Sequence, residues 1–217
     1  LRPDITPSIA RCVAKYYADE ELPVRLCYTG NTYTNTLKLQ GKLKEVTQIG
    51  AELVNDDSSA ADAEIIATVI DCFNEIGISD FQIEIGQIDY FKGLVAESGI
   101  SEDEEDQIKE YIHIKNFFGL EEYVDALDIS DSLKKAFVAF DSLFGGISML
   151  DKAEGYVSNE TSLEAVKRLR RVYAALECYG YQDHISFDLG MLDGYNYYTG
   201  IIFRGYTYGT GDAVVKG

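Results

Sequence analysis

The sequence predicts an α+β fold in which an antiparallel sheet is flanked by helices. Helical and extended segments are mixed without the strict alternation that produces a parallel sheet. The segment from Phe81 to Ile85 alternates apolar and polar residues, as a half-buried strand does. A helix from Asp62 to Ile76 follows a Ser/Asp-rich cap region and ends at Gly77, which offers a left-handed C-cap. With 217 residues, 46% of them hydrophobic, the chain is long enough for one domain with a packed core.

The first third of the chain predicts one helix followed by two extended segments. Thr6 offers an N-cap, and Pro7 suits the first turn of a helix. We expect a helix from Thr6 to Ala18, a strand from Pro23 to Tyr28 closed by Thr29-Gly30-Asn31, a turn at Gln40-Gly41-Lys42, and a second extended segment from Lys44 to Leu53.

The rest of the chain predicts two long helices, a helical middle region and a β-rich end. The acidic run from Glu102 to Asp106 suits the start of a helix, where negative charge is favoured. We expect long helices from Asp62 to Ile76 and from Ser162 to Tyr179, short helices between Phe91 and Asp151 separated at Gly93, Gly99, Gly119 and Gly145-Gly146, and strands at 81–85, 185–189, 195–203 and 213–215.

The excess of acidic residues indicates which kinds of molecule the protein is suited to bind. Acidic residues outnumber basic residues 37 to 19, which gives a formal net charge of −18. This argues against a general nucleic-acid surface, because phosphate binding needs clustered lysine and arginine. An acidic surface suits a basic protein partner, although a solvated acidic face without a partner is the commoner case.

No apolar segment approaches the ~20 residues that span a bilayer. The cysteines at positions 12, 27, 72 and 178 have neither the spacing of a zinc site nor the density of a disulfide framework. We therefore expect reduced, mostly buried thiols in a cytoplasmic protein, with no membrane partner and no metal site.

The common catalytic templates are missing. With His113 and His184 as the only histidines, a Ser-His-Asp triad has few possible bases. The phosphate-binding loop GxxxxGK[ST] does not occur, and a hairpin turn explains Gly209-Thr210-Gly211. Two groups of residues remain that could bind a ligand.

The first group combines Asp4 and Thr6 with Gln48 and Glu52. Gln48 and Glu52 are an even number of positions apart, so in a strand they point to the same face. Together the four side chains could bind a small cationic ligand. A polar sheet surface with helix caps explains the same residues, and both interpretations stay open.

The second group is Tyr195, Tyr197 and Tyr198, in a chain with 16 tyrosines and no tryptophan. In a strand, Tyr197 and Tyr198 face opposite sides, so at most one of them faces a given pocket. A tyrosine combines a flat apolar body with one hydroxyl, which suits an aromatic or imidazole ligand. Cross-strand packing is the alternative explanation.

Three motifs, in this order, resemble the histidyl-tRNA synthetases and their paralogues. Arg2-Pro3-Asp4-Ile5-Thr6 resembles the RP[ED]xT element of that family. The stretch from Tyr28 to Leu53, which contains Thr47-Gln48-Ile49-Gly50-Ala51-Glu52, resembles motif 2 of the class II synthetases. Gly194-Tyr195-Asn196-Tyr197-Tyr198-Thr199-Gly200 resembles the GLDYYTG signature of the histidine pocket.

The resemblance covers essentially the whole chain and implies its domain organisation. The last residues stop where the family continues into GRYD, and the family's dimer motif is expected upstream of Leu1. The resemblance therefore implies a single class II aminoacyl-tRNA synthetase-like domain over residues 1–217, truncated at both ends. It also implies a small helical insertion at about residues 91–151.

Two departures from the family pattern bear on catalysis. This chain has Tyr33-Thr34 where motif 2 of a working synthetase has Phe-Arg, and Asp193 where the family has the arginine of RGLDYY. In the family, the motif 2 arginine binds the α-phosphate of ATP and the amino-acid carboxylate. Losing such a contact removes stabilisation from the transition state, and Asp193 adds repulsion. The resemblance thus implies a protein with no catalytic residues and no cofactor.

The paralogues with this profile are the HisZ family, regulatory subunits of ATP phosphoribosyltransferase. The resemblance implies that the protein activates the short-form catalytic subunit HisG in the first step of histidine biosynthesis and contributes to feedback inhibition by L-histidine. It also implies a homodimer within a hetero-octamer, and no tRNA partner is expected. Two rival functions are a histidyl-tRNA synthetase catalytic core, which Thr34 and Asp193 disfavour, and a stand-alone histidine-binding domain.

The resemblance also assigns the ligand-binding residues. Asp4 and Thr6 would bind the ammonium group of histidine, Gln48 would form a hydrogen bond, and Glu52 would hold the imidazole with Tyr197 or Tyr198. A carboxylate beside an imidazole favours the protonated ring. Because the two arginines are missing, Lys42, Lys44 or backbone N–H groups would have to bind the carboxylate of the ligand.

Overall fold

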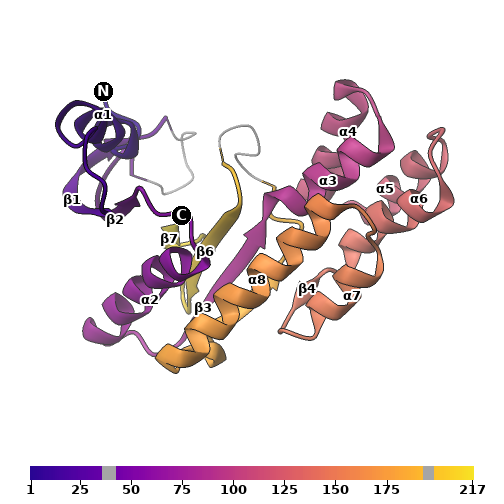
Figure 1. Cartoon of the computed structure of the whole chain (residues 1–217). Coiled ribbons are helices and arrows are strands. Elements are labelled where there is room, and N and C mark those ends of the chain that lie inside the picture. Colours follow the sequence, from indigo (N-terminus) through magenta and orange to yellow (C-terminus); the bar gives the residue numbers. More distant parts are fainter. Residues whose placement is uncertain (36–42, 193–197) are drawn as a thin grey trace. The chain divides into compact units, whose positions relative to one another are not determined.

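The structure is a computed structural model that describes residues 1–35, 43–192 and 198–217 (Figure 1). The chain divides into two compact units, the N-terminal unit Leu1–Ala61 and the C-terminal unit Asp62–Gly217. The turn expected at Gln40-Gly41-Lys42 lies outside the described residues, as does the segment from Asp193 to Tyr197.

The N-terminal unit is a helix with a β-hairpin. Its elements are α1 (Thr6–Tyr16), β1 (Val24–Tyr33) and β2 (Glu45–Val54). The two strands pair antiparallel over their whole length, from Val24 opposite Val54 to Tyr33 opposite Glu45. The helix begins at the expected residue, but its N-cap is Ile5 and Thr6 is its first helical residue.

The first strand is longer than the sequence predicts. We expected it to close at Thr29-Gly30-Asn31, and the structure continues it through Gly30 to Tyr33. Gly30 does not form a turn; it allows the side chains of Arg2 and Ile5 to approach the strand closely. A Cβ on Gly30 would lie 2.8 Å from Nη2 of Arg2 and 3.3 Å from Cδ1 of Ile5. The glycine therefore lets the N-terminal segment pack directly on β1.

In its described residues, the C-terminal unit combines a five-stranded sheet with the helices α2 to α8, and the first turn of α2 spans the division between the units. The helices are α2 (Ser59–Glu75), α3 (Ile88–Ser98), α4 (Glu102–His113), α5 (Phe117–Asp125), α6 (Asp131–Val138), α7 (Met149–Gly155) and α8 (Glu160–Tyr179), with 3-10 turns at Ala139–Asp141 and Gln182–His184. The strands, in spatial order, are β4 (Phe144–Gly145), β5 (Ile185–Asp188), β3 (Phe81–Gln87), β6 (Ile201–Thr207) and β7 (Val215–Lys216).

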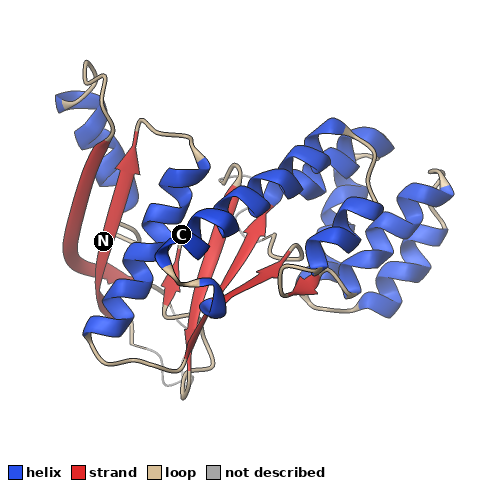
Figure 2. Ribbon diagram, turned by 60° about the horizontal axis from the view of Figure 1, so that its bottom comes forward, coloured by secondary structure: helices blue, strands red, loops and turns tan. Residues whose placement is uncertain are grey.

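The predicted α+β fold class is confirmed, with one difference in the sheet. β3 and β5 run parallel, whereas the other neighbouring strands are antiparallel. The sheet is therefore mixed. The parallel pair arises because the chain leaves β3 into a long helical region, α3 to α8, before it returns as β5 (Figure 2).

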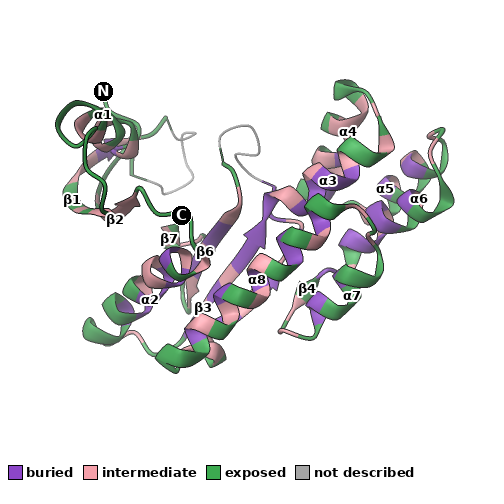
Figure 3. Ribbon diagram, in the orientation of Figure 1, coloured by how far each residue is buried: buried purple, intermediate pink, exposed green. Residues whose placement is uncertain are grey.

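The core of the C-terminal unit lies on one face of this sheet. Ile83 and Ile85 of β3 are fully buried, and they belong to one cluster with Ile70 of α2 and Leu169 and Val172 of α8. Buried positions follow β3 and the inward side of α8 (Figure 3). Residues on β3 between these isoleucines, such as Glu84, point to the opposite face of the sheet.

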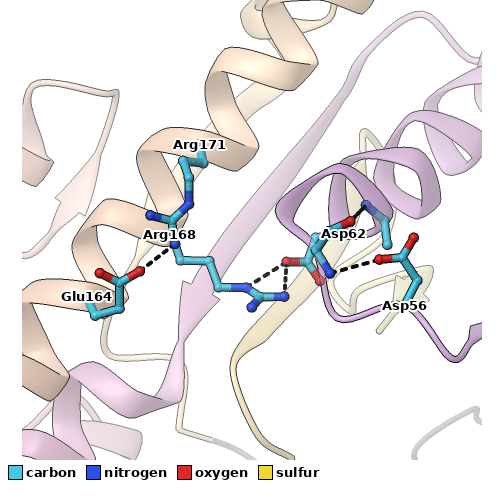
Figure 4. Close-up of polar contacts among 7 residues, drawn as sticks. Asp56, Asp62, Glu164, Arg168 and Arg171 are labelled. Atoms are coloured by element: carbon cyan, nitrogen blue, oxygen red, sulfur yellow. Dashed lines mark hydrogen bonds and ion pairs between the residues drawn. The ribbon is translucent and has the colours of Figure 1, made fainter.

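An ion pair links α2 to α8 across the core. Nε and Nη2 of Arg168 lie 2.9 and 2.8 Å from the same carboxylate oxygen of Asp62 (Figure 4). The two side chains are 27% and 22% exposed. Arg171, one turn further along α8, pairs instead with Glu164 of the same helix, where both side chains are more than half exposed.

The sequence predicts that two further glycines separate helices, and this prediction is wrong. Gly93 lies within α3 and Gly119 within α5. A Cβ on Gly93 would lie 2.3 Å from Oγ of Ser162, so this glycine permits the close crossing of α3 and α8. By contrast, the predicted helix ends at Gly99 and Gly180 are confirmed, since both have the left-handed conformation.

Two further expectations are wrong. The last long strand, expected from Tyr195 to Phe203, begins at Ile201 and extends to Thr207, and Tyr198 precedes it. The thiols are free but not mostly buried, since Cys12 is partly buried and Cys27, Cys72 and Cys178 are exposed. Cys27 is exposed because it alternates along β1 with Leu26 and Tyr28, which point to the more buried face. Among the described helices, none is long and apolar enough to cross a membrane.

Candidate ligand-binding site

The segment before α1 is fixed on the first strand of the hairpin. Nε and Nη2 of Arg2 donate to the carbonyl oxygen of Asn31, at 3.2 and 2.9 Å. The backbone N–H of Tyr33 donates to the carbonyl oxygen of Arg2. Ile5, 4% exposed, packs beside Gly30. Asp4 and Thr6, which flank Ile5 in the sequence, are thereby placed at the start of α1.

The structure brings Thr6 and Glu52 together, although 46 positions separate them. Oγ1 of Thr6 donates to Oε1 of Glu52 at 2.8 Å. Asp4 lies beside them, and its Oδ1 accepts from the backbone N–H of Thr6 at 3.2 Å. A carboxylate has about four lone-pair sites, so the bond from Thr6 leaves Glu52 with capacity for N–H groups of a ligand.

Gln48 lies on the same face of β2 as Glu52, as the even spacing predicts. Both are partly buried, whereas Ile49 and Ala51 between them are exposed. The Gln48 amide has two partners on β1. Its Oε1 accepts from Oγ1 of Thr32 at 3.1 Å, and its Nε2 donates to Oη of Tyr28 at 3.4 Å. These bonds fix the direction of the amide before any ligand binds.

Tyr28 lies between the two predicted ligand-binding residues of β2, and no sequence pattern assigned it to the site. It pairs with Gly50 in the hairpin register. A Cβ on Gly50 would lie 2.3 Å from Cζ of Tyr28, so the ring extends directly over this glycine. An aromatic residue opposite a glycine on paired strands is the signal that could have found it, but the register was needed first.

The substituted position of motif 2 lies at the far end of the hairpin. Thr34 follows β1 and is exposed, and its backbone N–H donates to the carbonyl oxygen of Lys44 at 2.9 Å. Oη of Tyr33 donates to Oε1 of Glu45 at 2.8 Å, and this bond, with the charge of Glu45, raises the pKa of Tyr33. Lys44 is described and exposed, whereas Lys42 lies outside the described residues.

A cavity of about 560 Å³ lies within the C-terminal unit, on the side of the sheet to which Arg204 points. This volume is in the range of small-molecule sites. Tyr198, which is 38% exposed, is the predicted ligand-binding residue that lines it. The other lining residues include His113, Ile202, Arg204, Tyr206 and Lys216.

Charged residues form a row across the sheet on this side. Glu84 of β3 lies opposite Arg204 of β6, which in turn lies opposite Lys216 of β7. Burial is the largest cause that raises the pKa of Glu84, and Asp188 adds to it, while Lys115 and Arg204 act in the opposite direction. No sequence motif singled out Arg204 or Lys216 as a candidate functional residue.

The predicted site residues thus fall on both units. Asp4 and Thr6, at the start of α1, are hydrogen-bonded to each other, and Thr6 is bonded to Glu52 of β2. Gln48 lies on the same face of β2 as Glu52 and is bonded to Thr32 and Tyr28 of β1. Tyr198 lines the cavity of the C-terminal unit. Asp193, Tyr195 and Tyr197 lie outside the described residues.

The helix and hairpin of the N-terminal unit, and the mixed sheet with its helices in the C-terminal unit, are the elements of a class II aminoacyl-tRNA synthetase-like protein. The family model described as histidyl-tRNA synthetase matches residues 1–217, the whole chain. The chain therefore belongs to the histidyl-tRNA synthetase family.

Known relatives in this family include regulatory proteins. The chain is 43% identical to the ATP phosphoribosyltransferase regulatory subunit of Acetivibrio thermocellus, over 100% of this chain and 52% of the relative. A crystal structure of an ATP phosphoribosyltransferase regulatory subunit/histidyl-tRNA synthetase from Bacillus halodurans superimposes with a TM-score of 0.91 at 34% identity, over 100% of this chain and 56% of that one.

A more distant structure supports the fold. A chain of the ATP phosphoribosyl transferase (HisG:HisZ) complex from Thermotoga maritima superimposes with a TM-score of 0.77 at 18% identity, over 100% of this chain and 74% of that one. The present chain spans about half the length of the Acetivibrio relative.

Proposed function

We propose that the protein to which this chain belongs is a non-catalytic regulatory subunit of ATP phosphoribosyltransferase. It would activate the short-form catalytic subunit HisG in the first step of histidine biosynthesis and take part in feedback regulation by L-histidine. Support comes from the name of the Acetivibrio relative and from the 34% identity to the Bacillus structure.

One observation carries the proposal. Thr6 is hydrogen-bonded to Glu52 of the hairpin, and Gln48 lies on the same face of β2 with its amide held by Thr32, whereas Thr34 stands where a working synthetase has its catalytic arginine. Amino-acid recognition and adenylate chemistry are thus separated on one hairpin. A side chain without charge at position 34 cannot neutralise the phosphate charge of an acyl-adenylate transition state.

Activation in trans tests the regulatory role. Short-form catalytic subunit should turn over slowly alone and faster when the full-length protein is added, and the two should co-elute in size-exclusion chromatography at micromolar concentrations. The mass of the complex would also test the expected homodimer within a hetero-octamer. If neither a complex nor a rate change were seen, the regulatory proposal would be wrong.

Catalytic silence tests the same proposal against its first rival. The full-length protein should not drive histidine-dependent exchange of pyrophosphate into ATP. Exchange at the rate of an authentic histidyl-tRNA synthetase would instead assign the protein to the aminoacylating enzymes. Histidine binding without any effect on the catalytic subunit would favour the other rival, a stand-alone histidine-binding domain.

We further propose that L-histidine binds at the residues that match the family's pocket, which are Asp4, Thr6, Gln48, Glu52, Tyr197 and Tyr198. In this proposal Glu52 pairs with the imidazolium, and Thr6 holds the carboxylate of Glu52 in position. Residues 1–217 would then belong to one class II synthetase-like domain with an insertion at about 91–151, as the resemblance implies.

Calorimetric titration of the full-length protein with L-histidine tests this site. Glu52→Gln should weaken binding by roughly 1–3 kcal/mol, the range for a lost hydrogen bond to a charged group. Glu45→Gln is a matched control, because Glu45 is on the same strand but alternates to the opposite, exposed face. Equal affinity of the wild type and Glu52→Gln would place the site elsewhere.

A further inference from the structure

One side of the helix α5 exposes an aromatic ring together with three carboxylates. The inner side of this helix packs into the core through Leu120 and Val124, which are fully buried. The residues at helical spacing on the other side, all of them exposed, are Phe118, Glu121, Glu122 and Asp125. These four residues form the outer face of α5. The helix lies beside α6 at one end of the C-terminal unit (Figure 1).

The carboxylates of the outer face do not stabilise the helix that carries them. None of the three makes an ion pair with another residue in the described part of the chain. Lys134 donates to the backbone carbonyl oxygen of Asp125 and not to its carboxylate. Asp125 is the last residue of α5, where negative charge opposes the helix dipole. Glu121 and Asp125 are four positions apart, and like charges at this spacing destabilise a helix.

The acidic residues of the neighbouring helix α4 have structural roles. Glu104 completes a capping box with Ser101, and the run begins in the first turn, where negative charge is favoured. Glu105 and Asp106 both pair with Lys109. The outer face of α5 has no such explanation. Residues that work against the local structure indicate a role outside the fold.

Apolar side chains are exposed at the same corner of the unit. Phe118 is 72% exposed, and Ile114, the C-cap residue of α4, is 53% exposed. Four residues span at most about 14 Å, so the two side chains lie on one local surface. Aromatic residues are enriched in the buried centres of protein interfaces, where the exposed ring would lose its contact with water.

The charge around this surface indicates what kind of partner it fits. Between Ser101 and Asp131 the chain has eleven acidic and two basic residues, a net charge of −9 against −18 for the whole chain. Such a field repels the phosphates of nucleic acids and anionic lipids. It attracts a basic protein surface and so favours encounter with it.

We propose that the outer face of α5 is a docking surface for a basic protein surface, with Phe118 entering an apolar pocket whose rim carries lysine or arginine. The inference rests on the proposed function, in which the protein that carries this surface is the short-form catalytic subunit. Phe118 then provides the buried contact, and Glu121, Glu122 and Asp125 form the charged rim around it.

Titration of the full-length protein with purified short-form catalytic subunit, at low and at high salt, tests the inference. Phe118→Ala should weaken the complex roughly tenfold or more at both salt concentrations, as expected for a central aromatic contact. Glu121→Gln/Glu122→Gln should weaken it roughly threefold to tenfold at low salt and less at high salt, because salt screens exposed charges. The double variant should be at least as stable as the wild type, since it removes like charge from a helix.

Two control variants make the same chemical changes elsewhere on the C-terminal unit. Phe144→Ala removes a phenylalanine that is 63% exposed on β4. Glu75→Gln/Glu177→Gln removes two exposed carboxylates, from the ends of α2 and α8. Both controls should bind the catalytic subunit as the wild type does. Thermal unfolding of each variant checks the fold, and the glutamine double variant serves if Phe118→Ala does not fold.

The outcomes separate this inference from the proposed function. If the wild type binds the catalytic subunit and both outer-face variants bind it equally well, or the controls lose as much affinity, the inference is wrong and the proposed function stands. If the wild type does not bind it, both are wrong. If Phe118→Ala changes the mass of the protein alone in sedimentation but not its affinity for the catalytic subunit, the outer face joins copies of this chain and the inference is overturned.

Discussion

The crossing of α3 and α8 allows a prediction whose size follows from the structure. Gly93→Ala places a Cβ 2.3 Å from Oγ of Ser162, 2.4 Å from Oδ1 of Asn159 and 2.8 Å from the backbone nitrogen of Ser162. Real Cβ atoms essentially never approach so closely, and a backbone atom cannot turn away as a flexible side chain can. The two helices must therefore separate.

Two hydrogen bonds stand to be lost when the helices separate. Asn159 is the N-cap of α8 and accepts from the backbone N–H of Ser162 at 2.7 Å. Ser162, fully buried, donates to the carbonyl oxygen of Tyr90 at 2.8 Å. Loss of the cap costs about 1 kcal/mol. A buried acceptor left without its partner costs about 1–3 kcal/mol. Alanine recovers about 1 kcal/mol of helix propensity relative to glycine.

The net expectation is a loss of about 2 kcal/mol in the free energy of unfolding. Urea denaturation of the full-length protein, followed by far-UV circular dichroism, measures it. Gly155→Ala is the matched control, because Gly155 ends α7 and a Cβ on it would have no heavy atom within 4 Å outside its own helix and chain neighbours. That variant should be as stable as the wild type or slightly more stable. A Gly93→Ala midpoint equal to that of the wild type would refute the steric argument.

Three further predictions concern stability. Asp62→Asn removes the partly buried charge that pairs with Arg168 and should destabilise the protein by about 1–2 kcal/mol, whereas Arg171→Gln, in an exposed pair on the same helix, should leave the urea midpoint unchanged. Ser101→Ala removes the N-cap of α4 and should cost about 1 kcal/mol, measured by the same denaturation, and an unchanged midpoint would contradict the capping role. Burial raises the pKa of Glu84 in the folded state, so the folded state binds its proton more tightly and stability contributed by protonated Glu84 is lost as pH rises through the folded pKa. Glu84→Gln should therefore gain stability relative to the wild type as pH rises above the ordinary glutamate pKa and through the raised folded pKa, and a pH-independent difference would count against this linkage.

The fold was predictable where local chemistry decides it. Gly99 and Gly180 end helices in the left-handed conformation, which glycine adopts without strain, so their role is readable from the sequence alone. Gly93 and Gly119 are the same residue type but lie within helices. The close neighbour of Gly93 is Ser162, far along the chain, whereas the nearest neighbour of Gly119 is Asn116, the N-cap of its own helix. Whether a glycine ends a helix or fits a crossing is a tertiary property.

The site was predictable in part for the same reason. The period of two along a strand places Gln48 and Glu52 on one face without knowledge of the fold. The bond between Thr6 and Glu52 joins residues 46 positions apart, and no spacing rule predicts it. Tyr28 was missed because its position beside Gln48 depends on the register, which pairs it with Gly50.

The hairpin also explains why the proposed absence of catalysis is compatible with the fold. At the substituted position, Thr34 is held through its backbone N–H and the carbonyl oxygen of Lys44, and this bond does not depend on the side chain. The register between β1 and β2 is fixed further along by paired residues such as Thr32 and Val46. The amide of Gln48 is likewise held by Thr32 and Tyr28. An arginine at position 34 therefore contributes to neither the pairing of the strands nor the direction of Gln48. In the proposed function, threonine at this position removes a phosphate contact and leaves the proposed histidine-binding residues in place, as a non-catalytic subunit would require.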